Sequence, residues 1–142
     1  MKFPRDARRN VNGGNITELR KLFGGHCKYL DGAVVDISRR ARALGQHAPV
    51  TFAHSMEATR LRRHNEKFTG QNQIIEGLLD DHESMICALS DESSGAGDEH
   101  VDIDTAEFIS VLLGQHVEMA RVLRDWLPET DLVKHEKRTD ES

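Results

Sequence analysis

The densest group of potential metal ligands in the chain is the sequence DDHE at residues 80–83. Carboxylate oxygens and imidazole nitrogens are donors that bind divalent iron in proteins. His116 falls in a later helical segment, and we expect it to reach His82 across a pair of helices. The candidate metal ligands are therefore Asp80, His82, Glu83 and His116. Two other interpretations stay open: the carboxylates form a solvated helix face, or the histidines are hydrogen-bonded in the interior.

Helices must position these residues, because apolar side chains recur at steps of three and four. Long helices are predicted over residues 16–44, 71–89 and 102–127, and a short one over residues 50–63. Asn15 is a suitable N-cap for the first, and Gly45 a suitable stop after it. Residues 91–97 are expected to form a polar loop. No strand-period segment of useful length is present, so the fold class is all-α.

Three regions follow from composition along the chain. Residues 1–14 are basic and irregular, residues 15–127 form the helical domain, and residues 128–142 are expected to be a polar, mobile tail. The 142 residues carry a formal net charge of −5, so the protein as a whole is not a polyanion binder. No apolar run is long enough to span a bilayer, and the start lacks the apolar core of a secretory signal.

The two cysteines, Cys27 and Cys87, lie far apart in helical patterns and lack CxxC spacing. We expect two buried, reduced thiols, because such residues pack as small apolar side chains. Reduced thiols are typical of the cytoplasm, which is the compartment we expect.

The segment from Asn10 to Gly45 contains NVNGGN, then LRKLF, then RRARALG. It resembles the Dps (mini-ferritin) family pattern HWNVxGxNF, LHxLF and DxxAERxxxLG. The helix at 102–127 and the DHE at 81–83 add further similarity, so the resemblance covers residues 10–127. It implies a ferritin-like bundle of three long helices and a short crossover helix, with the first family helix truncated. It also implies a homo-oligomer, either the dodecamer of the family or a dimer.

The same resemblance identifies the positions where the family binds iron between subunits. In this chain they are occupied by Arg8, Arg20, Gly24, Val35 and Arg39. Arginine has no lone pair to give a metal, and glycine and valine have no donor side chain. Iron is therefore a cofactor by resemblance only, and we expect no ferroxidase activity. The arginines have three open roles: solvating an uncovered surface, pairing with acidic side chains of a neighbouring subunit, or holding an anion.

We therefore expect a self-associating, stress-related protein of the Dps/ferritin type without ferroxidase activity. One alternative is an active iron-binding, peroxide-consuming protein with a relocated metal site. Another is a DNA-compacting protein, since multiple basic tails of a shell add avidity for phosphates. The DNA-binding residues would be Lys2, Arg5, Arg8 and Arg9.

Overall fold

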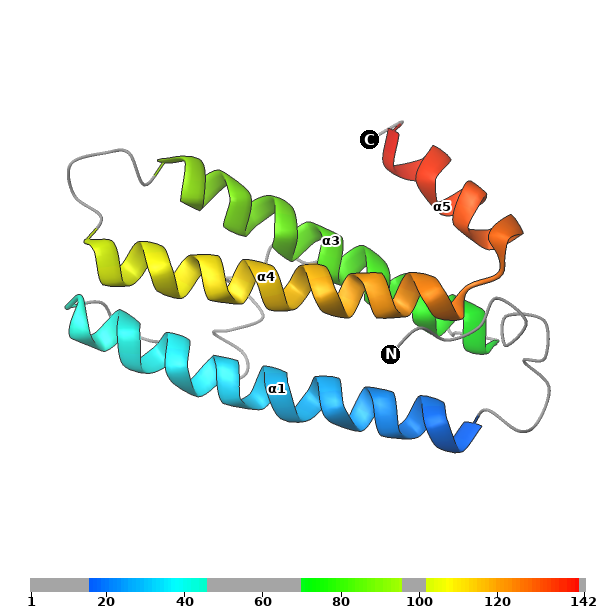
Figure 1. The fold of residues 1–142 in the computed structure, drawn as a ribbon, viewed down its shortest axis with the longest axis horizontal. Coiled ribbons are helices and arrows are strands. Elements are labelled where there is room, and N and C mark those ends of the chain that lie inside the picture. Colours follow the sequence, from blue (N-terminus) through cyan, green and yellow to red (C-terminus); the bar gives the residue numbers. More distant parts are fainter. Residues whose placement is uncertain (1–15, 46–69, 96–101, 141–142) are drawn as a thin grey trace. The chain divides into compact units, whose positions relative to one another are not determined.

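The computed structural model describes residues 16–45, 70–95 and 102–140, and within these ranges the chain is all-α (Figure 1). Its helices are α1 (Ile16–Ala43), α3 (Gln71–Gly95), α4 (Ile103–Trp126) and α5 (Glu129–Asp140). No strand occurs in these ranges, so the predicted all-α class is confirmed. The short helix predicted at residues 50–63 and the N-cap Asn15 lie outside the described residues. Helix α1 belongs to one compact unit, and α3, α4 and α5 belong to another.

The end of α1 follows the predicted stop. Gly45 has a φ of 78°, a left-handed conformation that suits glycine because it has no Cβ. Its N–H donates to the carbonyl of Arg42, and the N–H of Leu44 donates to that of Arg40. These bonds satisfy carbonyl groups that the helix end would otherwise leave unpaired.

Helices α3 and α4 pack side by side in opposite directions (Figure 1). Apolar residues of both helices are buried, among them Ile75 and Leu79 of α3 and Leu123 of α4. The prediction of a polar loop from residue 91 is wrong, because α3 continues to Gly95. The stretch contains no proline, and only its last residue is glycine. Polarity by itself does not end a helix whose backbone can still bond.

Both predicted ends of α4 are confirmed within a residue. Asp102 caps the start, and its carboxylate accepts the N–H of Thr105 at 2.9 Å. The last turn closes when the N–H of Leu127 donates to the carbonyl of Arg124. Pro128 follows and cannot continue the hydrogen-bond ladder.

The segment expected to be a mobile tail forms α5 instead. The carbonyl of Pro128 accepts the N–H groups of Asp131 and Leu132, which starts the first turn. Acidic residues lie in that turn, and Lys137 and Arg138 lie in the last one. Negative charges near the start and positive charges near the end of a helix interact favourably with its dipole, so this distribution stabilises α5.

Two further findings concern the surface. Cys27 and Cys87 are free, but both are exposed, so the expectation of buried thiols is wrong. Both cysteines lie within helices that mix polar and apolar residues. The spacing of the apolar residues therefore did not show whether either cysteine lies on the buried or the exposed face. In the described segments, no helix combines the length and the apolar character needed to cross a membrane.

Candidate functional site

His82 of α3 and His116 of α4 meet in the interior, as their spacing suggested. Their Nδ1 atoms lie 2.9 Å apart and both residues are buried. The ring centroids are 5.1 Å apart with the planes tilted by 52°. One nitrogen must therefore donate its N–H while the other accepts with its lone pair. The contact matches the hydrogen-bonded interpretation of these histidines, and burial lowers the pKa of His116.

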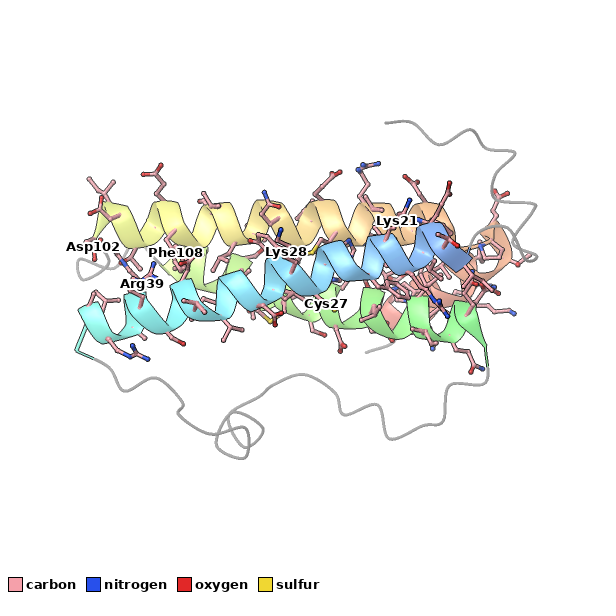
Figure 2. The ribbon with its side chains drawn as sticks, turned by 90° about the horizontal axis from the view of Figure 1, so that it is seen from below. Lys21, Cys27, Lys28, Arg39, Asp102 and Phe108 are labelled. Atoms are coloured by element: carbon pink, nitrogen blue, oxygen red, sulfur yellow. The ribbon has the colours of Figure 1, made fainter. Side chains whose placement is uncertain are left out.

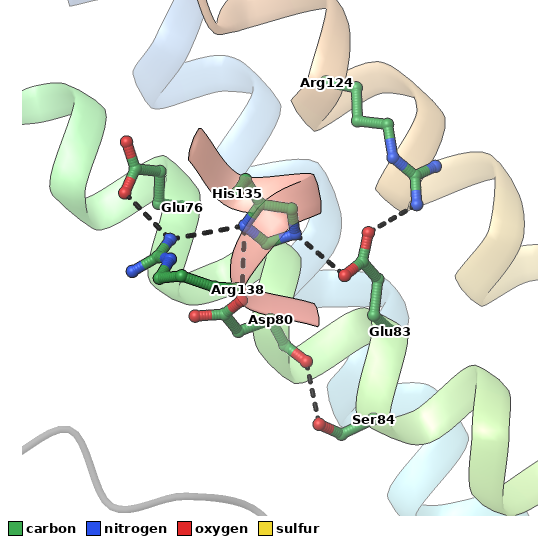
Figure 3. A network of polar contacts seen from close by, with 7 residues as sticks. All are labelled: Glu76, Asp80, Glu83, Ser84, Arg124, His135 and Arg138. Atoms are coloured by element: carbon green, nitrogen blue, oxygen red, sulfur yellow. Dashed lines mark hydrogen bonds and ion pairs between the residues drawn. The ribbon is translucent and has the colours of Figure 1, made fainter. Parts of the chain in front are cut away.

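The four candidate metal ligands do not form one site. Asp80 and Glu83 turn instead toward His135 of α5 (Figure 3). Nε2 of His135 lies 2.8 Å from Oε2 of Glu83, and its Nδ1 lies 3.3 Å from Oδ1 of Asp80. Only 3% of the His135 side chain is exposed. The structure thus divides the predicted set into a histidine pair and a carboxylate pair completed by a new residue.

Two arginines surround this second group, which we call the α5 cluster: Glu76, Asp80, Glu83, Arg124, His135 and Arg138. Arg124 of α4 donates to the other carboxylate oxygen of Glu83 at 2.5 Å. Arg138 of α5 donates to Glu76 at 3.2 Å, and the same nitrogen lies 3.4 Å from Nδ1 of His135 (Figure 3). The cluster joins three helices through charged groups.

His135 was not among the predicted ligands, because its segment was expected to be a tail. A signal was available: Leu132 and His135 are three residues apart in a stretch that follows a proline. This spacing places both on one face of a helix. Asn72 of α3 adds a further contact with α5 by donating to Asp131 at 2.9 Å.

The α5 cluster offers two kinds of chemistry. It fastens α5 to α3 and α4 by ion pairs, and it presents a set of metal donors. One oxygen each from Asp80 and Glu83 and one nitrogen of His135 lie within 4.8 Å of one another. Imidazole and carboxylate donors together suit a divalent transition metal.

The positions aligned with the iron ligands are on α1, except for Arg8, which lies outside the described residues. Arg20, Gly24, Val35 and Arg39 are all exposed. At about 100° per residue they fall within an arc of about 100° on one side of the helix. Leu19 and Ala33, the buried residues of α1, lie on the opposite side.

This side of α1 carries basic side chains and no cluster of metal ligands. Arg39 pairs with Asp36 at 3.2 Å, and both side chains are mostly exposed, so the pair adds little stability. Lys21 and Lys28 lie on the same helix (Figure 2). The N-terminal residues predicted to bind DNA, Lys2, Arg5, Arg8 and Arg9, lie outside the described residues.

Comparison with known proteins found two relatives. The chain is 28% identical over 118 residues to an uncharacterized low temperature-induced protein of Nostoc sp., and equally identical to the homolog of that protein in Anabaena variabilis. Each match covers 83% of this chain, but the chain spans only 66% of the length of these curated relatives. No family model and no solved structure matches the chain.

Proposed function

We propose that this chain is a ferritin-like, Dps-related, stress-related cytoplasmic protein that self-associates and does not oxidise iron. The observation that carries this proposal is the composition of one side of α1. The aligned positions on that side hold two guanidinium groups, a glycine and a valine, none of which donates to iron. The added positive charges oppose the approach of Fe(II).

Self-association is supported by apolar side chains that α1 leaves exposed. Val34 and Val35 are 62% and 55% exposed, and Ile16, Ile37 and Leu44 are exposed as well. Exposed apolar side chains are common at interfaces, since burying them removes apolar surface from water. A role in stress fits the two relatives, whose names describe them as induced by low temperature.

The first test is the mass of the purified full chain by light scattering, at several protein concentrations. We expect an assembly, with a dodecamer as the family form. A matched pair of variants locates the interface: Val35→Glu on α1 should reduce the mass, whereas Glu107→Gln on α4 should not. A wild-type chain that remains a monomer at every concentration would overturn self-association.

The second test uses the same sample under anaerobic conditions with Fe(II) and hydrogen peroxide. We expect oxidation no faster than in a protein-free blank. Rapid oxidation would overturn the inactive assignment and favour a relocated iron site. In that case Asp80→Asn should abolish the reaction, because Asp80 belongs to the carboxylate and histidine donors described above.

A further inference from the structure

We propose that Asp80, Glu83 and His135 form a site for a redox-inert divalent metal of the zinc class, which fastens α5 to α3. The site involves neither the aligned positions on α1 nor iron oxidation. It therefore goes beyond the proposed function, and zinc binding tests it by a measurement that does not involve iron oxidation.

The donor set fits zinc in type and number. Zinc binds imidazole nitrogen and carboxylate oxygen at about 2.0–2.2 Å, and three protein ligands leave a fourth position for water. Asp80 and Glu83 are three residues apart, so both leave α3 on one side. His135 reaches the same place from α5, which is why a metal here would join the two helices.

The donor distances require only a small adjustment. Bonds of about 2.0 Å in a tetrahedral site place the donors about 3.3 Å apart. One imidazole nitrogen binds one metal ion, so the histidine ligand is either Nε2, which lies 2.8 Å from Glu83, or Nδ1, which lies 3.3 Å from Asp80. The widest separation, up to 4.8 Å, must close by about 1.5 Å, which rotation of one carboxylate provides.

The surroundings have the features of a prepared site. His135 is almost fully buried, with both ring nitrogens facing carboxylate oxygens. Arg124 holds the outer oxygen of Glu83 and leaves Oε2 directed at the ring. Such outer partners orient ligands and keep them from rotating. The ring nitrogen that binds a metal ion cannot also carry a proton, so protons compete with the metal ion for it.

Arg138 allows a test in which the direction of the change in metal affinity is predicted. Its guanidinium lies 3.4 Å from Nδ1 of His135, where a positive charge opposes a metal ion. Removing that charge should strengthen metal binding, although it also removes the ion pair with Glu76. A cluster that only holds α5 by ion pairs would show the opposite, namely a loosened helix and no gain in affinity.

The experiment is equilibrium dialysis of the metal-free full chain against ZnCl2. We expect one tightly bound zinc per chain in the wild type. Affinity should fall at least about 10-fold in Glu83→Gln and His135→Gln, because each loses a ligand. It should be unchanged in Glu136→Gln and Glu107→Gln, which remove exposed carboxylates on α5 and α4. Arg138→Gln should bind zinc several-fold more tightly.

A second measurement separates metal binding from loss of the helix. Zinc should slow amide hydrogen exchange over residues 129–140 in the wild type, but not in Asp80→Asn. Asp80 is partly exposed, so this variant is the one expected to keep its fold, as circular dichroism will check. Equal zinc binding by the wild type and His135→Gln would assign the metal to other histidines and overturn the proposal. No binding above the buffer level would also overturn it.

Discussion

The Nδ1 atoms of His82 and His116 lie 2.9 Å apart between α3 and α4, so this contact holds one proton and has no room for two. A second proton would place two positive charges at hydrogen-bond distance in a buried place. Both residues are more than nine-tenths buried, so water does not screen that repulsion.

Folding should therefore weaken in acid. Burial lowers the pKa of His116 in the folded chain below its ordinary value of 6.5. Around that pH the unfolded chain therefore binds more protons than the folded chain. The contribution of neutral His116 to the free energy of unfolding is complete above pH 6.5 and is lost as the pH falls through that value. From about pH 7.5 to about pH 5.5, the free energy of unfolding should fall by up to about 1.4 kcal/mol from this group. Urea unfolding at both pH values measures it.

The matched control is His116→Leu, which replaces the titrating imidazole with an apolar side chain of similar size. Its stability at neutral pH should drop by about 1–3 kcal/mol, because His82 loses this partner. Its dependence on pH in the same range should be shallower than that of the wild type. An unchanged slope would show that other groups cause the acid sensitivity.

The capping aspartate of α4 offers a test of local structure. Asp102→Ala should cost about 1 kcal/mol, because its carboxylate accepts both the N–H and the hydroxyl of Thr105 at 2.9 Å. Asp102→Asn should keep most of this stability, because an amide oxygen also caps well. Thermal unfolding of both variants gives the comparison, and equal losses would mean that the charge, and not the cap, is what matters.

The sequence predicted those features that depend on local periodicity. The start of α3, both ends of α4 and the stop at Gly45 follow from apolar spacing and capping residues. The sequence did not predict features that depend on contacts between helices. Helix α5 is mostly polar, yet its contacts with α3, such as Asn72 with Asp131 and Arg138 with Glu76, connect it to the rest of the unit. The spacing of Leu132 and His135 indicates a helix face, but nothing within residues 128–142 identifies these partners on α3.

The candidate site shows the same limit more sharply. The adjacent residues of DDHE looked like one ligand group, but successive residues of a helix point about 100° apart. His82 therefore faces α4, and its neighbour Glu83 faces α5 and Arg124. Asp80 and Glu83 share a site with His135 of α5, and this residue was not considered because its segment was expected to be a tail.

Gly32 within α1 and Gly45 just after its end should respond in opposite ways to substitution by alanine. Gly45→Ala should destabilise the chain by about 1 kcal/mol, because φ of 78° is unfavourable for a residue with a Cβ. Gly32→Ala should stabilise it by about 0.5–1 kcal/mol, since it lies inside the helix and an added Cβ has nothing within 4 Å. Helical content and the unfolding midpoint report both effects. A gain at Gly45 would contradict the helix end described above, and a loss at Gly32 would contradict the open surface around that residue.

Restoring donors on α1 tests whether the aligned positions have lost an iron site. The double variant Val35→Asp with Arg39→Glu places two carboxylates one helical turn apart on the side of α1 opposite Leu19 and Ala33. It should bind Fe(II) measurably better than the wild type in anaerobic equilibrium dialysis, because hard oxygen donors replace an apolar group and a cation. The matched control, Val34→Asp with Arg42→Glu, changes the net charge equally without that spacing. If both variants gain the same affinity, charge alone explains the binding and α1 is not a former iron site.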